Sequence, residues 1–160
     1  MAMLAFDSRC PETATRETRI ISIPLPDQAF PVGTYLLREF YCPDRACDCR
    51  RVIIRIIQVD PQGDPEKPEA TLTYGWGSKA HCRKWFGDTV PESELDFHLT
   101  LNLELLSYQS PRAEEWLELV TDLVFSDPDY VARLGKHYRL FRSVGTKPVK
   151  GSSMRRFRPR

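Results

Sequence analysis

Three of the five cysteines in this chain lie within eight residues, at Cys42, Cys47 and Cys49. Closely spaced thiolates of this kind are typical ligands of zinc, which takes four donors in a tetrahedron. Side chains alternate along an extended segment, so Cys47 and Cys49 are expected to point to the same side. Pro43 and Asp44 favour a turn that would bring Cys42 back toward them. We therefore predict that the three cysteines share one metal ion, and that it is zinc because thiolates are soft ligands.

A fourth ligand is expected from the hairpin that follows the cluster. If Asp60 pairs with Glu69 across the turn, the same register places Cys82 opposite Cys47. Residues that pair directly across two strands share a face of the sheet, so Cys82 would project toward the cluster. The sequence therefore favours a closed site of four cysteines.

Other side chains are alternatives for that fourth position. A slip of one residue in the register would exchange Cys82 for His81, because neighbouring residues of a strand face opposite sides. His98 is a more remote candidate, and the carboxylate of Asp44 or Asp48 can fill an oxygen position. Imidazole nitrogens and carboxylate oxygens both occur in zinc sites beside thiolates.

Arginines surround the cysteine cluster, at Arg45, Arg50 and Arg51. Positive charge stabilises thiolates and raises their reactivity, so a thiol redox role is an alternative to metal binding. The same charges would also offset the negative charge of a thiolate-rich zinc site. A third alternative is that the cysteines are reduced thiols that do not share a metal ion. Cys10 lies apart, near the N-terminus, and is not included in the site.

The C-terminal segment differs in charge from the rest of the chain. Residues 143–160 hold six of the 23 basic residues and no acid, which leaves 22 acids against 17 bases elsewhere. Its arginines and single aromatic could hold nucleic-acid phosphates and stack on a base. These candidate contacts are Arg155, Arg156, Phe157, Arg158 and Arg160. The simpler interpretation of this composition is a solvated, disordered tail, and it is preferred.

No motif in the chain points to a particular reaction. The zinc-protease, zinc-deaminase, phosphate-loop and nucleophile-elbow signatures are all missing from the sequence. Aromatic residues at Tyr74, Trp76, Trp85 and Phe86 could line a groove beside the cysteines, although core positions are favoured for them. We therefore predict a structural zinc site in a protein that binds a protein or nucleic-acid partner. The alternative is a metal-dependent hydrolase or thiol redox protein that uses the same cysteines.

Hydrophobic patterns predict the elements that position these residues. The expected strands are 19–23, 34–41, 52–59, 70–76 and 95–105, the last from a strict alternation of apolar and polar residues. Ser110-Pro111 and Asp127-Pro128 are typical helix starts, so helices are expected over 110–124 and 127–141. His137 is expected at the surface or edge of the second helix.

Strands that precede helices indicate an α+β fold, with an antiparallel sheet of about five strands and a C-terminal helical hairpin. Residues 19–142 are expected to form a single domain, with a loose lead-in over 1–18 and a disordered basic tail over 143–160. No apolar run has the length of a signal peptide's core or a membrane span, so a cytoplasmic protein is predicted. Thiols stay reduced there, which favours metal binding over disulfides.

Part of the chain resembles a family of uncharacterised bacterial proteins, some of which are named SEC-C motif or zinc-chelation proteins. The resemblance lies in residues 40–52, which read FYCPDRACDCRRV, and 73–76, which read TYGW, and it extends over about 33–142. It implies a metal site and no established reaction. SEC-C proteins carry a second cysteine-rich zinc motif at the C-terminus, whereas no cysteine follows Cys82 here, so the partner binding that this name implies is not carried over.

Overall fold

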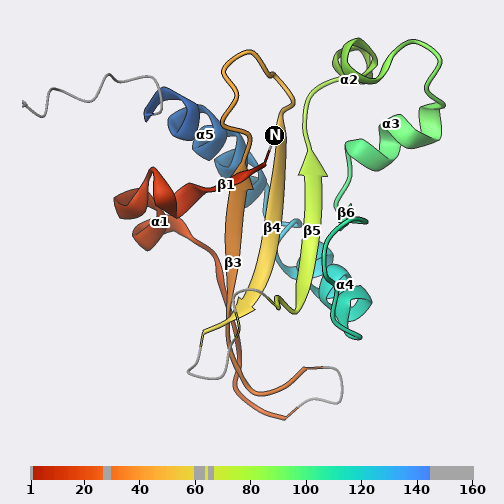
Figure 1. Cartoon of the computed structure of the whole chain (residues 1–160). Helices are drawn as coiled ribbons and strands as arrows, with labels where there is room; N and C mark the ends of the chain where they lie inside the picture. The colour runs from red at the N-terminus through yellow and green to blue at the C-terminus, as the bar shows by residue number, and fades with distance from the viewer. Residues whose placement is uncertain (1, 27–29, 60–63, 65–66, 145–160) are drawn as a thin grey trace, which may run out of the picture.

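The computed structural model describes residues 2–26, 30–59, 64 and 67–144 (Figure 1). Most of the basic tail therefore lies outside the described residues, including the candidate nucleic-acid contacts at positions 155–160. Its predicted disorder and nucleic-acid binding stay predictions from composition. Among the described helices, none is both long and apolar enough to cross a bilayer.

An antiparallel sheet forms the centre of the molecule (Figure 1). Its strands are β1 (Leu4–Ala5), β2 (Ile20–Ile23), β3 (Gly33–Tyr41), β4 (Arg51–Gln58), β5 (Ala70–Gly75) and β6 (Asn102–Leu103). The spatial order is β1-β3-β4-β5-β6, and β2 pairs with the other half of the same edge of β3. The predicted α+β class with its antiparallel sheet is confirmed.

Five α-helices and one 3-10 helix complete the described fold. They are η1 (Phe6–Ser8), α1 (Pro11–Glu17), α2 (Lys79–Phe86), α3 (Glu92–His98), α4 (Ala113–Leu123) and α5 (Pro128–Val144). The last two match the helices expected from the sequence, and they lie behind the sheet in Figure 1. Helices α2 and α3 lie beyond one end of β5.

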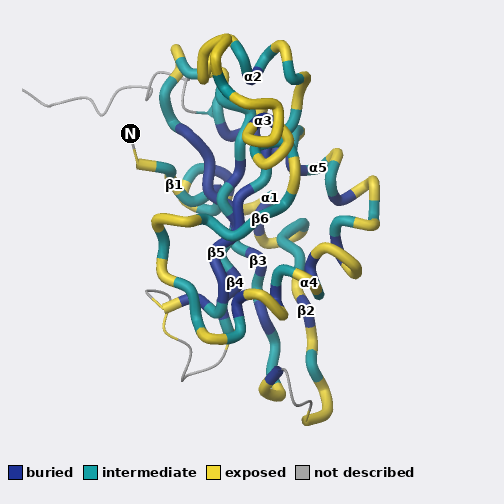
Figure 2. Tube along the Cα trace, turned by 90° about the vertical axis from the view of Figure 1, so that its right-hand side faces the viewer, coloured by how far each residue is buried: buried dark blue, intermediate teal, exposed yellow. Residues whose placement is uncertain are grey.

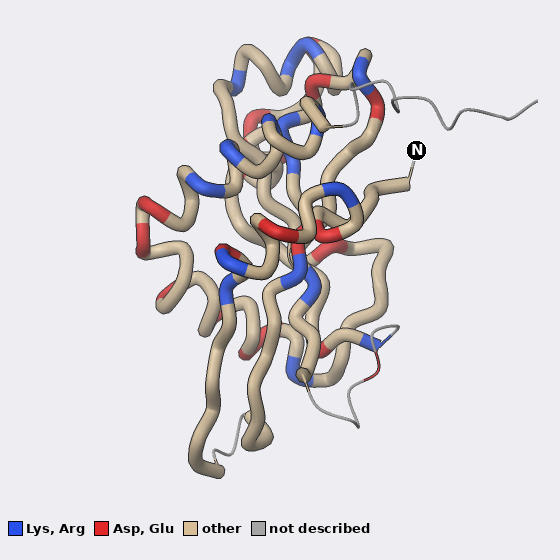
Figure 3. The backbone as a smooth tube through the Cα atoms, turned by 90° about the vertical axis from the view of Figure 1, so that its left-hand side faces the viewer, with Lys and Arg blue, Asp and Glu red and all other residues tan. Residues whose placement is uncertain are grey.

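The core lies between the sheet and helices α4 and α5. Alternate residues of the two central strands are fully buried toward the helices, whereas their neighbours on the other face are half-exposed. The buried strand residues meet Trp116 of α4 and Phe141 of α5 in one hydrophobic cluster. Burial runs along the middle of the strands in Figure 2. In Figure 3, acidic and basic positions are interspersed over the side of the molecule that carries α1.

The prediction of a long strand over 95–105 is wrong. Helix α3 occupies its first half, and only Asn102 and Leu103 pair with β5. Two acidic residues in the first turn of α3 stabilise the helix start, which the alternation of apolar residues concealed. The end of α3 packs so closely on β5 that a Cβ at Gly75 would clash with the carbonyl oxygen of His98. This part of the edge of β5 is therefore covered by helix rather than paired with a strand.

The loose lead-in expected over residues 1–18 is also wrong. Strand β1 pairs Leu4 with Tyr41, and helix α1 follows it after η1. Phe6, Cys10 and Ala14 are buried against the rest of the core. These residues are spaced four apart, but the polar residues around them hide the pattern, and their partners lie far away in the sequence. The segment is ordered by tertiary contacts.

Candidate metal centre

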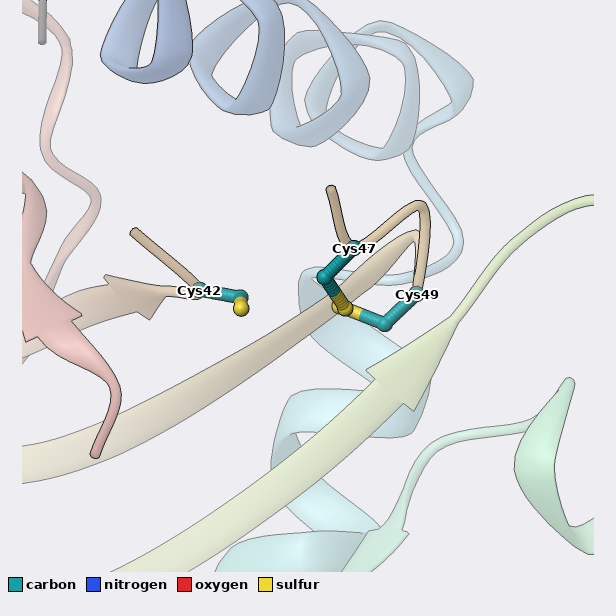
Figure 4. A group of neighbouring side chains, drawn as sticks. All are labelled: Cys42, Cys47 and Cys49. Carbon is teal, nitrogen blue, oxygen red and sulfur yellow. The ribbon is translucent and has the colours of Figure 1, made fainter. Parts of the chain in front are cut away.

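The three clustered cysteines lie side by side at one end of the sheet. Their sulfur atoms all lie within 4.8 Å of one another. Cys42 directly follows β3, whereas Cys47 and Cys49 belong to the loop that leads into β4 (Figure 4). The predicted grouping of these three side chains is confirmed, and it has the donor chemistry and the spacing to hold a metal ion.

Local hydrogen bonds shape the loop that carries the cysteines. The Asp44 carboxylate accepts from the backbone N–H of Ala46 at 2.9 Å, and the N–H of Cys47 donates to the Asp44 carbonyl at 3.2 Å. This is the turn that the sequence predicts after Cys42. Arg50 then adopts a φ of 48°, a left-handed conformation uncommon outside glycine, as the chain enters β4.

Two helices hold the same loop from outside. The guanidinium of Arg142 in α5 donates to the backbone carbonyls of Cys47 and Arg45, the second at 2.9 Å. From α2, Nε2 of His81 lies 2.7 Å from the Asp48 carbonyl oxygen, so this ring nitrogen carries the proton and donates. The loop is therefore positioned by tertiary contacts from both helices. Arg142 was missed by sequence reasoning, because no local signal connects residues 95 positions apart.

The thiols are only partly exposed to water. Cys42 is buried, and Cys47 and Cys49 are half-buried. Burial, with a hydrogen bond to Cys47, raises the pKa of the Cys49 thiol to about 12, and burial also raises the pKa of Cys42. Thiols with raised pKa values are poor nucleophiles at neutral pH, which weakens the redox alternative.

Two arginines beside the cluster, Arg50 and Arg51, bond to side chains other than the thiols. Arg50 donates to the Asp48 carboxylate at 3.2 and 3.0 Å and holds its pKa below the usual range. Arg51 donates to Oγ1 of Thr73 at 2.7 Å. Both guanidiniums thus have partners other than a cysteine, and Arg51 lines the same cleft as the cysteines.

The hairpin register that led to Cys82 is wrong. Ile56 pairs with Ala70, three residues away from the Thr73 that the expected register gives it. Strand β5 then ends at Gly75, and the chain turns at Gly77, with a φ of 116°, into α2. Cys82 is therefore a buried helical residue, and it lies outside the group of mutually close ligand atoms.

The alternative fourth ligands are not part of the group either. Nε2 of His81 is used on the Asp48 carbonyl, and the imidazole of His98 stacks on Phe86 with 4.1 Å between ring centroids. Burial lowers the pKa of His98. The carboxylates of Asp44 and Asp48 are occupied by the loop's own hydrogen bonds. Within the described part of the chain, the structure brings three metal ligands together rather than four.

A cleft of about 600 Å³ opens beside the three cysteines, which line one of its walls. Its other lining residues are Met3, Asp44, Ala46, Arg51, Ile53, Trp85 and Glu104. Trp85 and Phe86 are 45% and 41% exposed, so the expected core positions are wrong for these two aromatics. Tyr74 and Trp76 do pack against the core. The groove that the sequence offered as the alternative is the one that Trp85 lines.

Comparisons with protein-family models, with curated proteins and with solved structures gave no match. The chemistry of the centre therefore has to be deduced from its own residues.

Proposed function

We propose that this protein binds one zinc ion through Cys42, Cys47 and Cys49, and that the metal fixes the loop of residues 42–50 as one wall of a binding cleft. The protein would act as a metal-dependent interaction module in a reducing compartment such as the cytoplasm. The observation that carries this proposal is the approach of three sulfur atoms to within 4.8 Å on a loop that two helices hold in place.

The donor set favours zinc. Thiolates select soft or borderline metals over magnesium and calcium. Zinc has no geometric preference from its d electrons, and in structural sites it is usually bound by four ligands in a tetrahedron. All five cysteines are free thiols in the structure, and three sulfurs in one group exceed the two that a disulfide needs. A metal uses all three.

The metal would contribute directly to the stability of the loop. It would link the end of β3 to the start of β4, across a segment with no regular secondary structure between Cys42 and Arg50. Because the ligands come together only in the folded chain, the free energy of metal binding adds to the free energy of folding.

Metal content per chain tests the proposal, measured by elemental mass spectrometry on protein purified without a chelator or a metal-affinity column. We expect about one zinc per wild-type chain. Single replacements C42S, C47S and C49S should each lose most of it, whereas the matched replacement C10S should keep it, since Cys10 is buried at a distance from the cluster. Wild-type protein without metal, or equal loss in C10S, would contradict the proposal.

A metal-dependent hydrolase is the second candidate function, because catalytic zinc keeps an open coordination position and three ligands leave one. The cleft beside the cysteines gives a substrate access to it. Two considerations make it the weaker candidate. The two carboxylates that line the cleft, Asp44 and Glu104, lie outside the ligand group, and each already accepts a hydrogen bond from a backbone N–H. Three thiolates also donate enough charge to weaken the metal as a Lewis acid.

A further inference from the structure

We propose that the fourth zinc ligand is a thiolate supplied by another molecule, which enters through the cleft beside the cysteines. This inference rests on the zinc site proposed above and specifies what that site recognises. The recognised chemistry is a cysteine side chain on an apolar body.

Within the described residues, no fourth side chain joins the three cysteines to complete a tetrahedral zinc site. His81, Asp44 and Asp48 lie outside the group of mutually close ligand atoms. Cys82 lies in α2, also outside that group. It lines a smaller cavity of about 170 Å³ that adjoins the cleft and shares Cys49, Arg51 and Trp85 with it. Zinc with three protein ligands takes a fourth donor from solution.

The cleft that the three cysteines line is much larger than a water molecule needs. The cleft measures about 600 Å³, within the usual range of sites that hold small molecules or side chains. A water molecule occupies roughly 30 Å³ of liquid volume. The volume therefore fits a ligand that places a donor atom on the metal and a larger body against the walls.

The walls of the cleft combine apolar and charged side chains. Met3, Ile53 and the half-exposed Trp85 are among its apolar lining residues. Arg51, whose guanidinium donates to Thr73 Oγ1, also lines the cleft. Of the two acids in the lining, Asp44 closes its own turn and the Glu104 carboxylate accepts from the N–H of Leu106 and from Ser107 Oγ. The site thus offers a metal to a donor atom and an apolar wall to the body that carries it.

A thiolate fits this combination better than a carboxylate does. Sulfur ligands match a metal that already carries three thiolates, whereas oxygen donors prefer harder cations. Binding exchanges a metal-bound water for the thiolate, and the proton of the incoming thiol goes to solvent. No bond to carbon changes, so neither an oxidant nor a reductant is involved.

Substitution of cobalt(II) for zinc tests this inference, because sulfur-to-cobalt charge-transfer absorption grows with the number of bound thiolates. We expect full-length protein loaded with cobalt under anaerobic conditions to show absorption for three thiolates. N-acetylcysteine amide should raise it by about one third, the ratio of four bonds to three. N-acetylserine amide, the matched compound with an oxygen in place of sulfur, should not. The C82S protein should behave like wild type in each measurement.

Each contrary outcome has a separate meaning. Failure to bind cobalt at all would contradict the zinc site itself. Cobalt bound by three thiolates and unchanged by saturating N-acetylcysteine amide would overturn this inference and leave the zinc site standing. Absorption for four thiolates without added thiol, falling to three in C82S, would show that the fourth ligand comes from the chain and would also overturn it.

A short peptide with leucines on both sides of one cysteine tests the apolar wall. We expect W85A to weaken binding of this peptide about tenfold, and W85F to restore it, with little change for N-acetylcysteine amide. Unchanged affinity of W85A for the peptide would overturn the placement of the ligand's body against Trp85. Circular dichroism of W85A, expected to match wild type because the ring is 45% exposed, controls for folding.

Discussion

Two clusters of ionisable side chains lie a few residues apart along β3 and differ in how they are completed. In the core, His137 of α5 lies between two carboxylates, with Nδ1 2.7 Å from Glu39 and Nε2 2.7 Å from Glu17. Tyr41 donates a further hydrogen bond to Glu39 at 2.6 Å. At the end of the same strand, Cys42 begins the cysteine cluster, where three sulfur atoms lie close enough together to hold a metal ion and line a cleft.

The ion pairs of the core cluster are formed within the protein. His137 and Glu39 are each only 2% exposed in their side chains. Carboxylates accept hydrogen bonds, so both ring nitrogens carry protons and the imidazole is positively charged. Burial alone would lower the pKa of His137, but hydrogen bonds to Glu39 and Glu17 outweigh it and raise the pKa. One buried cation thus connects α1, β3 and α5.

In these two clusters, the surroundings of the ionisable side chains determine their role. Both ring nitrogens of His137 have a partner from the chain and the ring itself is buried, so the cluster is suited to stabilising the fold. The cysteines line a cleft, and their sulfur atoms lie close enough together to hold a metal ion. A cluster of the second kind is where a ligand is expected.

Removal of the core cation should have the largest effect. H137A leaves the Glu39 carboxylate buried without its partner, and losing one member of a buried ion pair costs about 3–5 kcal/mol. We expect a loss of unfolding free energy of that order in urea titrations. K136A, an exposed neighbour on the same helix, should change it by less than about 0.5 kcal/mol. Equal stability of H137A and K136A would show that the buried bridge does not stabilise the fold.

Removal of the metal should have the next largest effect. At free zinc about one hundred times the dissociation constant, binding adds about 2.7 kcal/mol to the stability of the folded state. A chelator should therefore lower the melting temperature of wild-type protein and of C10S, but leave that of C49S unchanged. If chelation with verified metal loss left the wild-type melting temperature unaltered, the metal would have no structural role.

The contact between α5 and the cysteine loop should tune the metal site. R142A removes the donors to the carbonyls of Cys47 and Arg45, so the ligands lose support from outside. Changes of this kind typically weaken metal affinity 10- to 100-fold, and we expect about tenfold here. Competition with a chelator of known affinity measures it. R139A, on an exposed position of the same helix, is the control and should retain wild-type affinity.

The smallest effect should be the change of unfolding free energy with pH. This change reports on the His137 cluster separately from the cysteine cluster. A raised pKa means that the folded state holds the His137 proton more tightly than the unfolded state does. Its stabilisation is therefore complete below the unfolded pKa of about 6.5 and is lost as pH rises through the raised folded value. Arg133, which donates to the Glu17 carbonyl, and the carboxylates of Glu17 and Glu39 are the charged groups around it.

Unfolding free energies measured from pH 5 to pH 9 with zinc removed test this sign. Wild type should lose its advantage over H137Q as pH rises. An advantage that grew with pH would mean that His137 is neutral in the folded protein.

Much of the fold and part of the site follow from the sequence. The cysteine group depends on neighbours within eight residues, and α4 and α5 depend on apolar spacing and proline starts. The hairpin of β4 and β5 follows from two apolar segments around a turn. Each of these patterns is decided by residues close together in the chain, where spacing alone determines which side chains share a face.

The tertiary structure decided everything that joins distant segments. It ordered the N-terminal residues against α5, placed His137 in the core instead of at the expected surface, and brought Arg142 to the cysteine loop. It also set a register three residues away from the expected one and thereby moved Cys82 into a helix. The physical reason is that such contacts depend on burial and hydrogen bonding between residues many positions apart, which leave no periodic pattern in the sequence.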